Sequence, residues 1–190
     1  MDFSCVEDCS DCCVRREYHP TRRHGKVGVL LLPGEVGRVR ELAAGMGLRA
    51  EILPRIGVSG DGGLRVIAYQ LMGIDGNGDT CPFLGDGRSP HGGRACTIYG
   101  ERPLACRAYP LSGLDPVRLD AKCRFCGECG AKGGEDGLAE VGVDGGLGGE
   151  EEALREIIGR TAAGGRVWRY ATGVCEPGDE HLVCRGWIRD

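Results

Sequence analysis

The stretch that decides the fold is "AEILPRIGVSGDGGLRVIAYQLMGI", residues 50–74. Residues 50–58 and 63–74 have the apolar and β-branched content of two strands, and "SGDGG" between them contains an Asp-Gly pair typical of hairpin turns. We therefore expect a small antiparallel sheet built on this hairpin.

The chain before the hairpin predicts one buried strand and one helix. "VGVLLL", residues 27–32, is a short apolar run of strand length. In residues 33–47 Pro33 suits an early helical position and Gly47 a C-cap, and apolar residues repeat at helical spacing at Val36, Val39, Leu42 and Met46. The fold class predicted is α+β.

The chain after the hairpin contains more loops. Residues 76–94 are rich in Gly, Asp and Pro and predict loops around a short knuckle, and "PLACRAYP", residues 103–110, predicts one short helix. A second helix is expected over 150–163, with Leu154, Ile157 and Ile158 on its apolar face. The tail contains strand-like pieces whose pairing the sequence does not indicate.

These elements predict a loop-rich domain of small antiparallel sheet and short helices around a cysteine-ligated metal centre. We expect a cysteine-cluster domain over 1–134 and a Gly-rich linker over 135–149. The helix and tail of 150–190 are expected to pack on the same domain.

Composition and charge narrow the classes of function. Twelve cysteines accompany only two Trp, three Phe and five Tyr. The net charge is -4 with no basic patch, and the longest apolar run is too short to cross a bilayer, so we expect neither nucleic acid nor membrane as a partner. Acidic residues interrupt the N-terminus where a secretion signal would be apolar, which predicts a cytoplasmic protein. In that compartment dense cysteines indicate metal binding or catalysis rather than disulfides.

The first cysteine group lies in "CVEDCSDCCV", residues 5–14, and comprises Cys5, Cys9, Cys12 and Cys13. Adjacent cysteines rarely bind one tetrahedral ion, because the ligands must converge from different backbone segments. Cys12 and Cys13 are therefore expected to have different roles: ligands of two metals, a bridge between them, or one ligand and one buried thiol.

The other cysteines supply partners for this group. Cys81, Cys96 and Cys106 lie in separate segments, and Cys123, Cys126 and Cys129 repeat the three-cysteine part of a bacterial ferredoxin motif without its Cys-Pro ligand. Cys175 and Cys184 are expected to pack as small apolar residues, with a second small site including His181 as the alternative. His19, His24 and His91 lie in polar stretches and are expected to be solvated.

"CVEDCSDCC", "CPFL", "CTIYGERPLACRAYP" and "CGAKGG" together resemble the YkgJ-like cysteine-cluster family, described as zinc- or iron-chelating domains, over about residues 3–134. The most specific features are the adjacent cysteine pair that ends a C-x3-C-x2-C-C string and the run from Cys96 to Pro110. Flagellin lysine-N-methylases share the motif and are associated with an iron-sulfur cluster.

The resemblance implies a metal centre with ligands Cys5, Cys9, Cys12, Cys13, Cys81, Cys96, Cys106 and Cys129, and with Cys123 and Cys126 as further candidates for the last place. The supporting residues of the motif are Tyr99, Arg102, Pro103, Arg107 and Tyr109. Positive charge from the two arginines that flank Cys106 would favour its thiolate. A surface ion pair or a carboxylate clamp is the alternative role for these arginines.

The function predicted is a cytoplasmic metal-binding protein that holds an iron-sulfur cluster, with 4Fe-4S as one form, or zinc. A protein substrate or a redox partner would fit this role. One alternative is a lysine N-methylase-like enzyme that uses the metal centre and S-adenosylmethionine, although no glycine-rich cofactor loop is present. The other alternative is a disulfide-stabilised structural protein.

Overall fold

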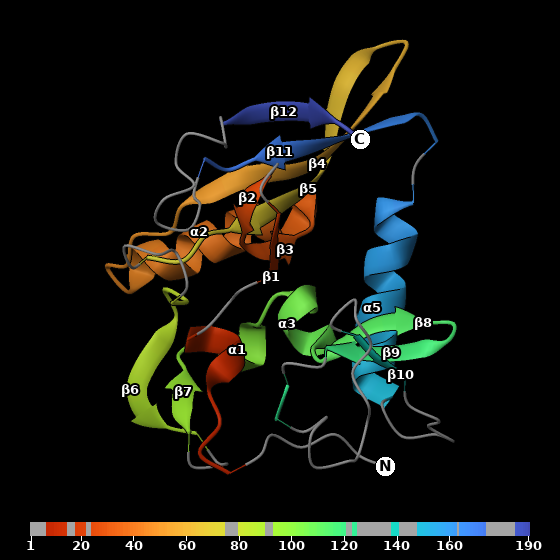
Figure 1. Cartoon of the computed structure of the whole chain (residues 1–190). Coiled ribbons are helices and arrows are strands. Elements are labelled where there is room, and N and C mark those ends of the chain that lie inside the picture. Colours follow the sequence, from red (N-terminus) through yellow and green to blue (C-terminus); the bar gives the residue numbers. More distant parts are fainter. Residues whose placement is uncertain are drawn as a thin grey trace. The chain divides into compact units, whose positions relative to one another are not determined.

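The hairpin predicted at residues 50–74 forms the middle of a five-stranded antiparallel sheet in the computed structural model (Figure 1). Strand β4 (Ile52–Gly60) pairs with β5 (Gly63–Leu71), and the pairing closes where Gly60 lies opposite Gly63. Asp61 and Gly62 connect the strands, so the predicted hairpin and its turn are confirmed.

The structure describes residues 7–14, 18–21, 24–74, 80–89, 93–120, 123–124, 138–140, 148–162, 164–173 and 185–190. Contacts within the chain divide it into two units. The first unit consists of Met1–Cys12 and Gly85–Gly159, and the second of Cys13–Leu84 and Arg160–Asp190. Helices and antiparallel strands confirm the α+β class.

In the second unit the sheet has the order β12-β11-β4-β5-β3. Strand β3 (Val29–Leu31) lies on one side of the hairpin, and β11 (Arg166–Ala171) and β12 (Gly186–Arg189) lie on the other. The C-terminal strands thus extend the sheet beyond β4, a pairing that the sequence did not indicate. A separate two-stranded sheet joins β1 (Tyr18–Thr21) to β2 (Gly25–Val27).

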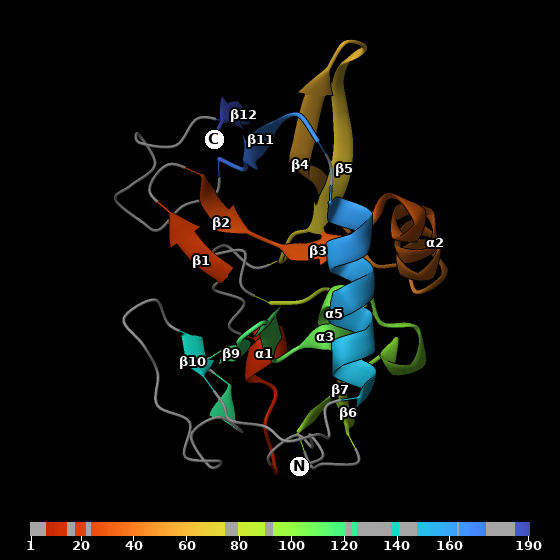
Figure 2. The ribbon, with the colours of Figure 1, turned by 90° about the vertical axis from the view of Figure 1, so that its right-hand side faces the viewer.

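The predicted helix of residues 33–47 is confirmed as a 3-10 turn η1 (Pro33–Glu35) that continues into α2 (Val36–Gly45), which runs beside the sheet (Figure 2). A carboxylate oxygen of Glu35 accepts the backbone N–H of Leu32 at 2.7 Å. Val36, Val39 and Ala43 are buried, whereas Met46 is 43% exposed just after the helix and is not part of its buried face. Gly47 follows with φ +66°, the left-handed conformation expected after a helix.

A buried glutamine replaces backbone pairing where the strands are irregular. The Gln70 side chain is fully buried; its carbonyl oxygen accepts the Gly28 N–H at 2.9 Å and its amide donates to Pro54 O at 2.8 Å. Gly28 lies between β2 and β3, and the β4–β5 register shifts between Pro54 and Ile56. Gln70 therefore makes hydrogen bonds with backbone groups that the strand pairing does not satisfy, the Gly28 N–H and the Pro54 carbonyl.

The outer part of this sheet carries a small aromatic cluster. The rings of Tyr170 and Trp187 meet edge to face at 5.3 Å between centroids, and Trp168 Nε1 donates to Ser59 Oγ at 3.1 Å. A Cβ at Gly57 would lie 3.0 Å from the Trp187 ring, so a larger residue there would crowd the indole.

In the first unit β8 (Leu111–Leu114), β9 (Val117–Asp120) and β10 (Leu138–Glu140) form a sheet of order β10-β9-β8. The strand β10 lies within the stretch 135–149 that was predicted as a linker. A second pair joins β6 (Leu84–Arg88) to β7 (Arg94–Cys96). The prediction of loops around a short knuckle over residues 76–94 missed β6, because this strand contains Gly and Asp rather than the β-branched residues that indicate strands.

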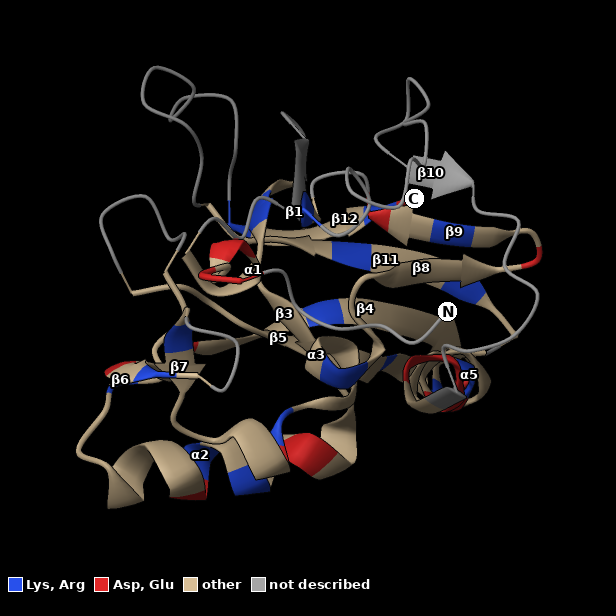
Figure 3. Ribbon diagram, turned by 90° about the horizontal axis from the view of Figure 1, so that it is seen from below, with Lys and Arg blue, Asp and Glu red and all other residues tan. Residues whose placement is uncertain are grey.

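Two helices of the first unit follow the predictions. Helix α3 (Leu104–Ala108) begins after Pro103 and ends before Pro110. Helix α5 (Gly148–Thr161) buries Ala153, Leu154 and Ile157, whereas Ile158 of the predicted apolar face is 49% exposed. Both α2 and α5 carry basic and acidic residues side by side (Figure 3).

No helix in the described part of the chain is long and apolar enough to cross a membrane.

Gly28→Ala is expected to lower the free energy of unfolding by about 3 kcal/mol, since its Cβ would lie 2.1 Å from the carbonyl oxygen of Leu71 and would force β3 from β5. The matched control is Gly37→Ala in α2, where a Cβ meets nothing within 4 Å and a helical alanine should stabilise by about 0.5 to 1 kcal/mol. Urea denaturation measures both. Equal midpoints for the two variants would contradict the packing described for Gly28.

Candidate metal centre

Seven of the twelve cysteines are described, and all seven are thiols rather than disulfides. Cys81 is buried, and the other six are partly exposed: Cys9, Cys12, Cys13, Cys96, Cys106 and Cys123. The predicted ligands Cys5, Cys126 and Cys129 lie outside the described residues, as do Cys175, His181 and Cys184. The candidate centre is therefore described from the segments that carry the seven thiols.

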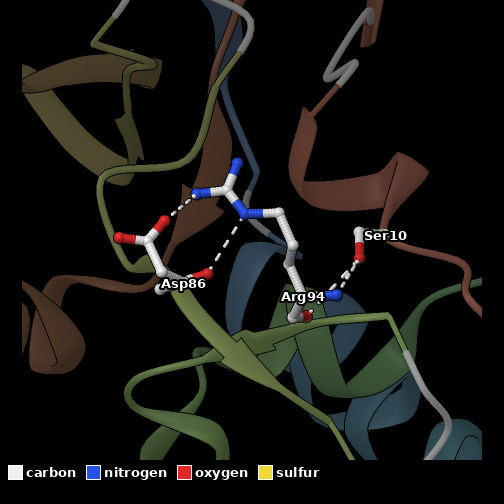
Figure 4. Close-up of polar contacts among 4 residues, drawn as sticks. Ser10, Asp86 and Arg94 are labelled. Atoms are coloured by element: carbon white, nitrogen blue, oxygen red, sulfur yellow. Dashed lines mark hydrogen bonds and ion pairs between the residues drawn. The ribbon is translucent and has the colours of Figure 1, made fainter.

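The segment that carries Cys9 binds to the β6–β7 hairpin, which carries Cys96 (Figure 4). The Arg94 backbone N–H donates to Ser10 Oγ at 2.7 Å, and the Ser10 hydroxyl donates to Arg94 O at 3.5 Å. Ser10 is next to Cys9, and Arg94 is two residues before Cys96. This exchange therefore holds two cysteine-bearing segments side by side although 84 residues separate their contact points in sequence.

Two further features fix this contact. A Cβ at Gly93 would lie 2.4 Å from the carbonyl oxygen of Cys9, so the two backbones approach more closely than any other residue would permit. The Arg94 side chain turns back to its own hairpin, where it donates to Gly85 O at 3.2 Å and to the Asp86 carboxylate at 3.0 Å (Figure 4). Arg88 adds an exposed ion pair of 3.4 Å to Asp8.

Helix α1 (Asp11–Val14) is tied to the segment of Cys123. Arg124 donates through Nε to one Asp11 carboxylate oxygen at 2.8 Å and through a terminal nitrogen to the other at 3.4 Å. Asp11 precedes Cys12, and Arg124 follows Cys123. A contact through two hydrogen bonds fixes the relative orientation of Arg124 and Asp11 as well as their separation.

Cys13 and Cys81 meet through their backbones in the second unit. The Cys81 N–H donates to Cys13 O at 2.8 Å. Cys81 also begins a turn in which the Leu84 N–H donates to Cys81 O at 3.1 Å, and the neighbouring Phe83 is buried. The expected knuckle around Cys81 thus holds this cysteine at a fixed position beside Cys13.

The motif around Cys106 forms a turn and a helix. The turn η2 (Tyr99–Glu101) precedes Pro103, whose carbonyl oxygen accepts the N–H groups of Cys106 at 2.9 Å and Arg107 at 3.1 Å. Arg102 lies over the Tyr99 ring, with its guanidinium carbon 3.9 Å from the ring centroid, and its Nε donates to Tyr99 O at 3.0 Å. Arg107 is exposed, and Tyr109 ends the helix before a cis peptide bond to Pro110. The Arg102 side chain is therefore held by an aromatic ring, an arrangement that the sequence did not predict.

The described part of the chain does not gather its thiols into a metal site. Among those residues no three His, Cys, Asp or Glu side chains form a group that could hold a metal ion. The donor chemistry does fit zinc or an iron-sulfur cluster, because the cysteines are thiols that become thiolate ligands on deprotonation.

Nε2 of His24 is buried, so the expectation that this histidine is solvated was wrong for that atom.

Searches of protein-family models, curated proteins and solved structures found no match to this chain. The resemblance to the YkgJ-like family therefore stays a prediction that rests on the cysteine motifs. Ser10, Asp11, Arg94 and Arg124, which tie the cysteine segments together, were not found from the sequence. Their only signal is position, since each lies within two residues of a cysteine.

Ser10→Ala is expected to speed hydrogen exchange of the Arg94 amide about fivefold, because the variant loses a hydrogen bond that contributes roughly 1 kcal/mol. Hydrogen-exchange mass spectrometry of the peptide that contains Arg94 measures the effect. Ser112→Ala is the matched control, since Ser112 Oγ donates to Arg118 O at 3.3 Å in another hairpin. If Arg94 exchange is the same in both variants, the described contact between the two segments is contradicted.

Proposed function

We propose that the protein binds metal through its cysteines and holds an iron-sulfur cluster or zinc. The observation that carries this proposal is that polar contacts join the chain neighbours of cysteines from distant parts of the sequence. Ser10 and Arg94 connect the segments of Cys9 and Cys96, and Asp11 and Arg124 connect those of Cys12 and Cys123.

The chemistry of the donors favours these metals over others. Thiolates are soft ligands that select zinc, Cu(I) and iron-sulfur clusters, whereas Ca²⁺ and Mg²⁺ need oxygen ligands. Iron-sulfur is favoured slightly by the supply of thiols and the scarcity of histidines, four in the whole chain. When bound, a cluster would supply one-electron redox chemistry, whereas zinc in a closed thiolate site would stabilise the fold.

A reducing compartment suits this role. Metal-binding thiols must stay reduced, so we propose that the protein works in the cytoplasm. A cluster-bearing form would exchange electrons with a protein partner or act on a protein substrate.

Anaerobically purified protein is expected to contain iron with acid-labile sulfide or to contain zinc. Elemental analysis together with the visible absorption spectrum distinguishes the two, since a cluster gives broad charge-transfer bands and zinc gives a colourless sample. A wild-type protein with neither metal, after anaerobic purification and reconstitution, would overturn the proposal.

Cys12→Ser and Cys106→Ser are each expected to lower the metal content, because each removes a predicted thiolate ligand. Val14→Ser is the matched control: it introduces the same side chain in α1 but leaves every thiol in place. Elemental analysis of the three variants purified in parallel checks the assignment. Full metal content in both cysteine variants would show that these residues are not ligands.

A further inference from the structure

Both tryptophans of the chain lie on one face of the five-stranded sheet in the second unit. Trp168 and Tyr170 are two residues apart on β11, and Trp187 on β12 lies opposite Tyr170. Residues two apart in a strand share a face of the sheet, and so do residues that lie opposite one another in antiparallel strands. These three rings therefore form one surface, the aromatic face.

The aromatic face extends across β4 to β5. The position of a Cβ on Gly57 of β4 lies 2.9 Å from a methyl carbon of Leu64 and 3.0 Å from the Trp187 ring, so side chains from β5 and β12 meet above this glycine. The Trp168 indole bonds to Ser59 of β4 at 3.1 Å. Leu64 is 42% exposed, and the three rings are partly exposed. The result is a broad apolar surface that solvent reaches.

The strands of this sheet are basic. Their sequences contain arginines but no lysine and no acidic residue, and the arginines are Arg55, Arg65, Arg166, Arg169 and Arg189. Arg166 lies two residues before Trp168, and Arg189 lies opposite Trp168, so both exposed side chains share the aromatic face. The expectation of no nucleic-acid partner rested on the net charge of the whole chain, -4, which does not describe this sheet.

Two acidic residues lie near these strands, and each is bonded to another arginine. The Glu51 carboxylate accepts from Arg185 at 2.6 Å, and the Asp190 carboxylate accepts from Arg169 at 2.7 Å. Arg169 is next to Trp168 and Tyr170 in β11, so its side chain belongs to the opposite face. Among the described residues, the charge on the aromatic face is therefore positive.

We propose that the aromatic face binds single-stranded nucleic acid. Bases stack on tryptophan and tyrosine rings, and arginine guanidinium groups bind the phosphates between them. A neutral sugar would use the rings without the arginines, and an acidic polysaccharide would use the arginines without the rings. Recognition by stacking and charge is tolerant of base sequence. This binding is independent of the proposed metal centre.

The intrinsic fluorescence of the intact protein tests the proposal, because both tryptophans of the chain lie on the aromatic face. An RNA decamer of uridine and a DNA decamer of thymidine are titrated separately at low ionic strength. Each is expected to quench the tryptophan emission. The logarithm of the association constant should fall with the logarithm of the salt concentration with a slope of about -1.4, the value for two phosphate contacts to a single strand.

Variants of the aromatic face locate the binding. Arg166→Gln and Arg189→Gln should each weaken binding roughly fivefold and make the salt slope shallower by about 0.7, because each loses one phosphate contact. Tyr170→Leu keeps both tryptophans and should weaken binding roughly fivefold or more through lost stacking. Arg65→Gln is the matched control with unchanged affinity, since Arg65 lies opposite Val58 on the other face. Circular dichroism checks that each variant is folded.

Four results would overturn the proposal. The first is unchanged emission at roughly 1 mM decamer, tenfold above the weakest usual Kd of non-specific binding. The second is equal weakening in Arg65→Gln and Arg166→Gln. The third is a heparin oligosaccharide that binds as tightly as the decamers, which would leave the rings without a role. The fourth is quenching by a neutral oligosaccharide at the same concentration, which would assign the face to sugar.

Discussion

The hydrogen bond from the Arg94 amide to the Ser10 hydroxyl fixes how the N-terminal cysteine segment lies on the β6–β7 hairpin, and the arrangement of the first unit's thiols depends on it. The bond joins residues that are 84 positions apart, and closing a flexible loop of that length would cost about 4 kcal/mol in chain entropy, an upper bound because β1–β6 and α2 lie between them. A neutral hydrogen bond contributes roughly 1 kcal/mol, and an exposed ion pair such as Asp8–Arg88 contributes less. These contacts set the register of the segments, but they are too weak to hold them firmly.

Metal binding would supply the missing stabilisation. Apparent binding free energies of structural zinc sites are about 10 to 16 kcal/mol, which exceeds the entropy of closing the loop several times. Under the proposed function, the contacts beside the thiols would bring the cysteine-bearing segments near one another before a metal binds. Folding and metal loading would then be linked.

Local patterns predicted the hairpin of β4 and β5 and the helices α2, α3 and α5, because turn residues, capping residues and apolar spacing act over a few positions. The pairing of β11 with β4 was not predictable, since it joins strands more than 100 residues apart in sequence. The cysteines were visible as candidates from their spacing. Their polar ties were not, because Ser10 and Arg124 are ordinary surface residue types whose partners only the folded chain reveals.

The central claim is that several cysteines, and not other residue types, hold the metal. X-ray absorption spectroscopy at the edge of the bound metal, on protein purified without oxygen, tests it most directly. The account predicts a first shell of sulfur alone at about 2.3 Å. A first shell dominated by oxygen or nitrogen would contradict it.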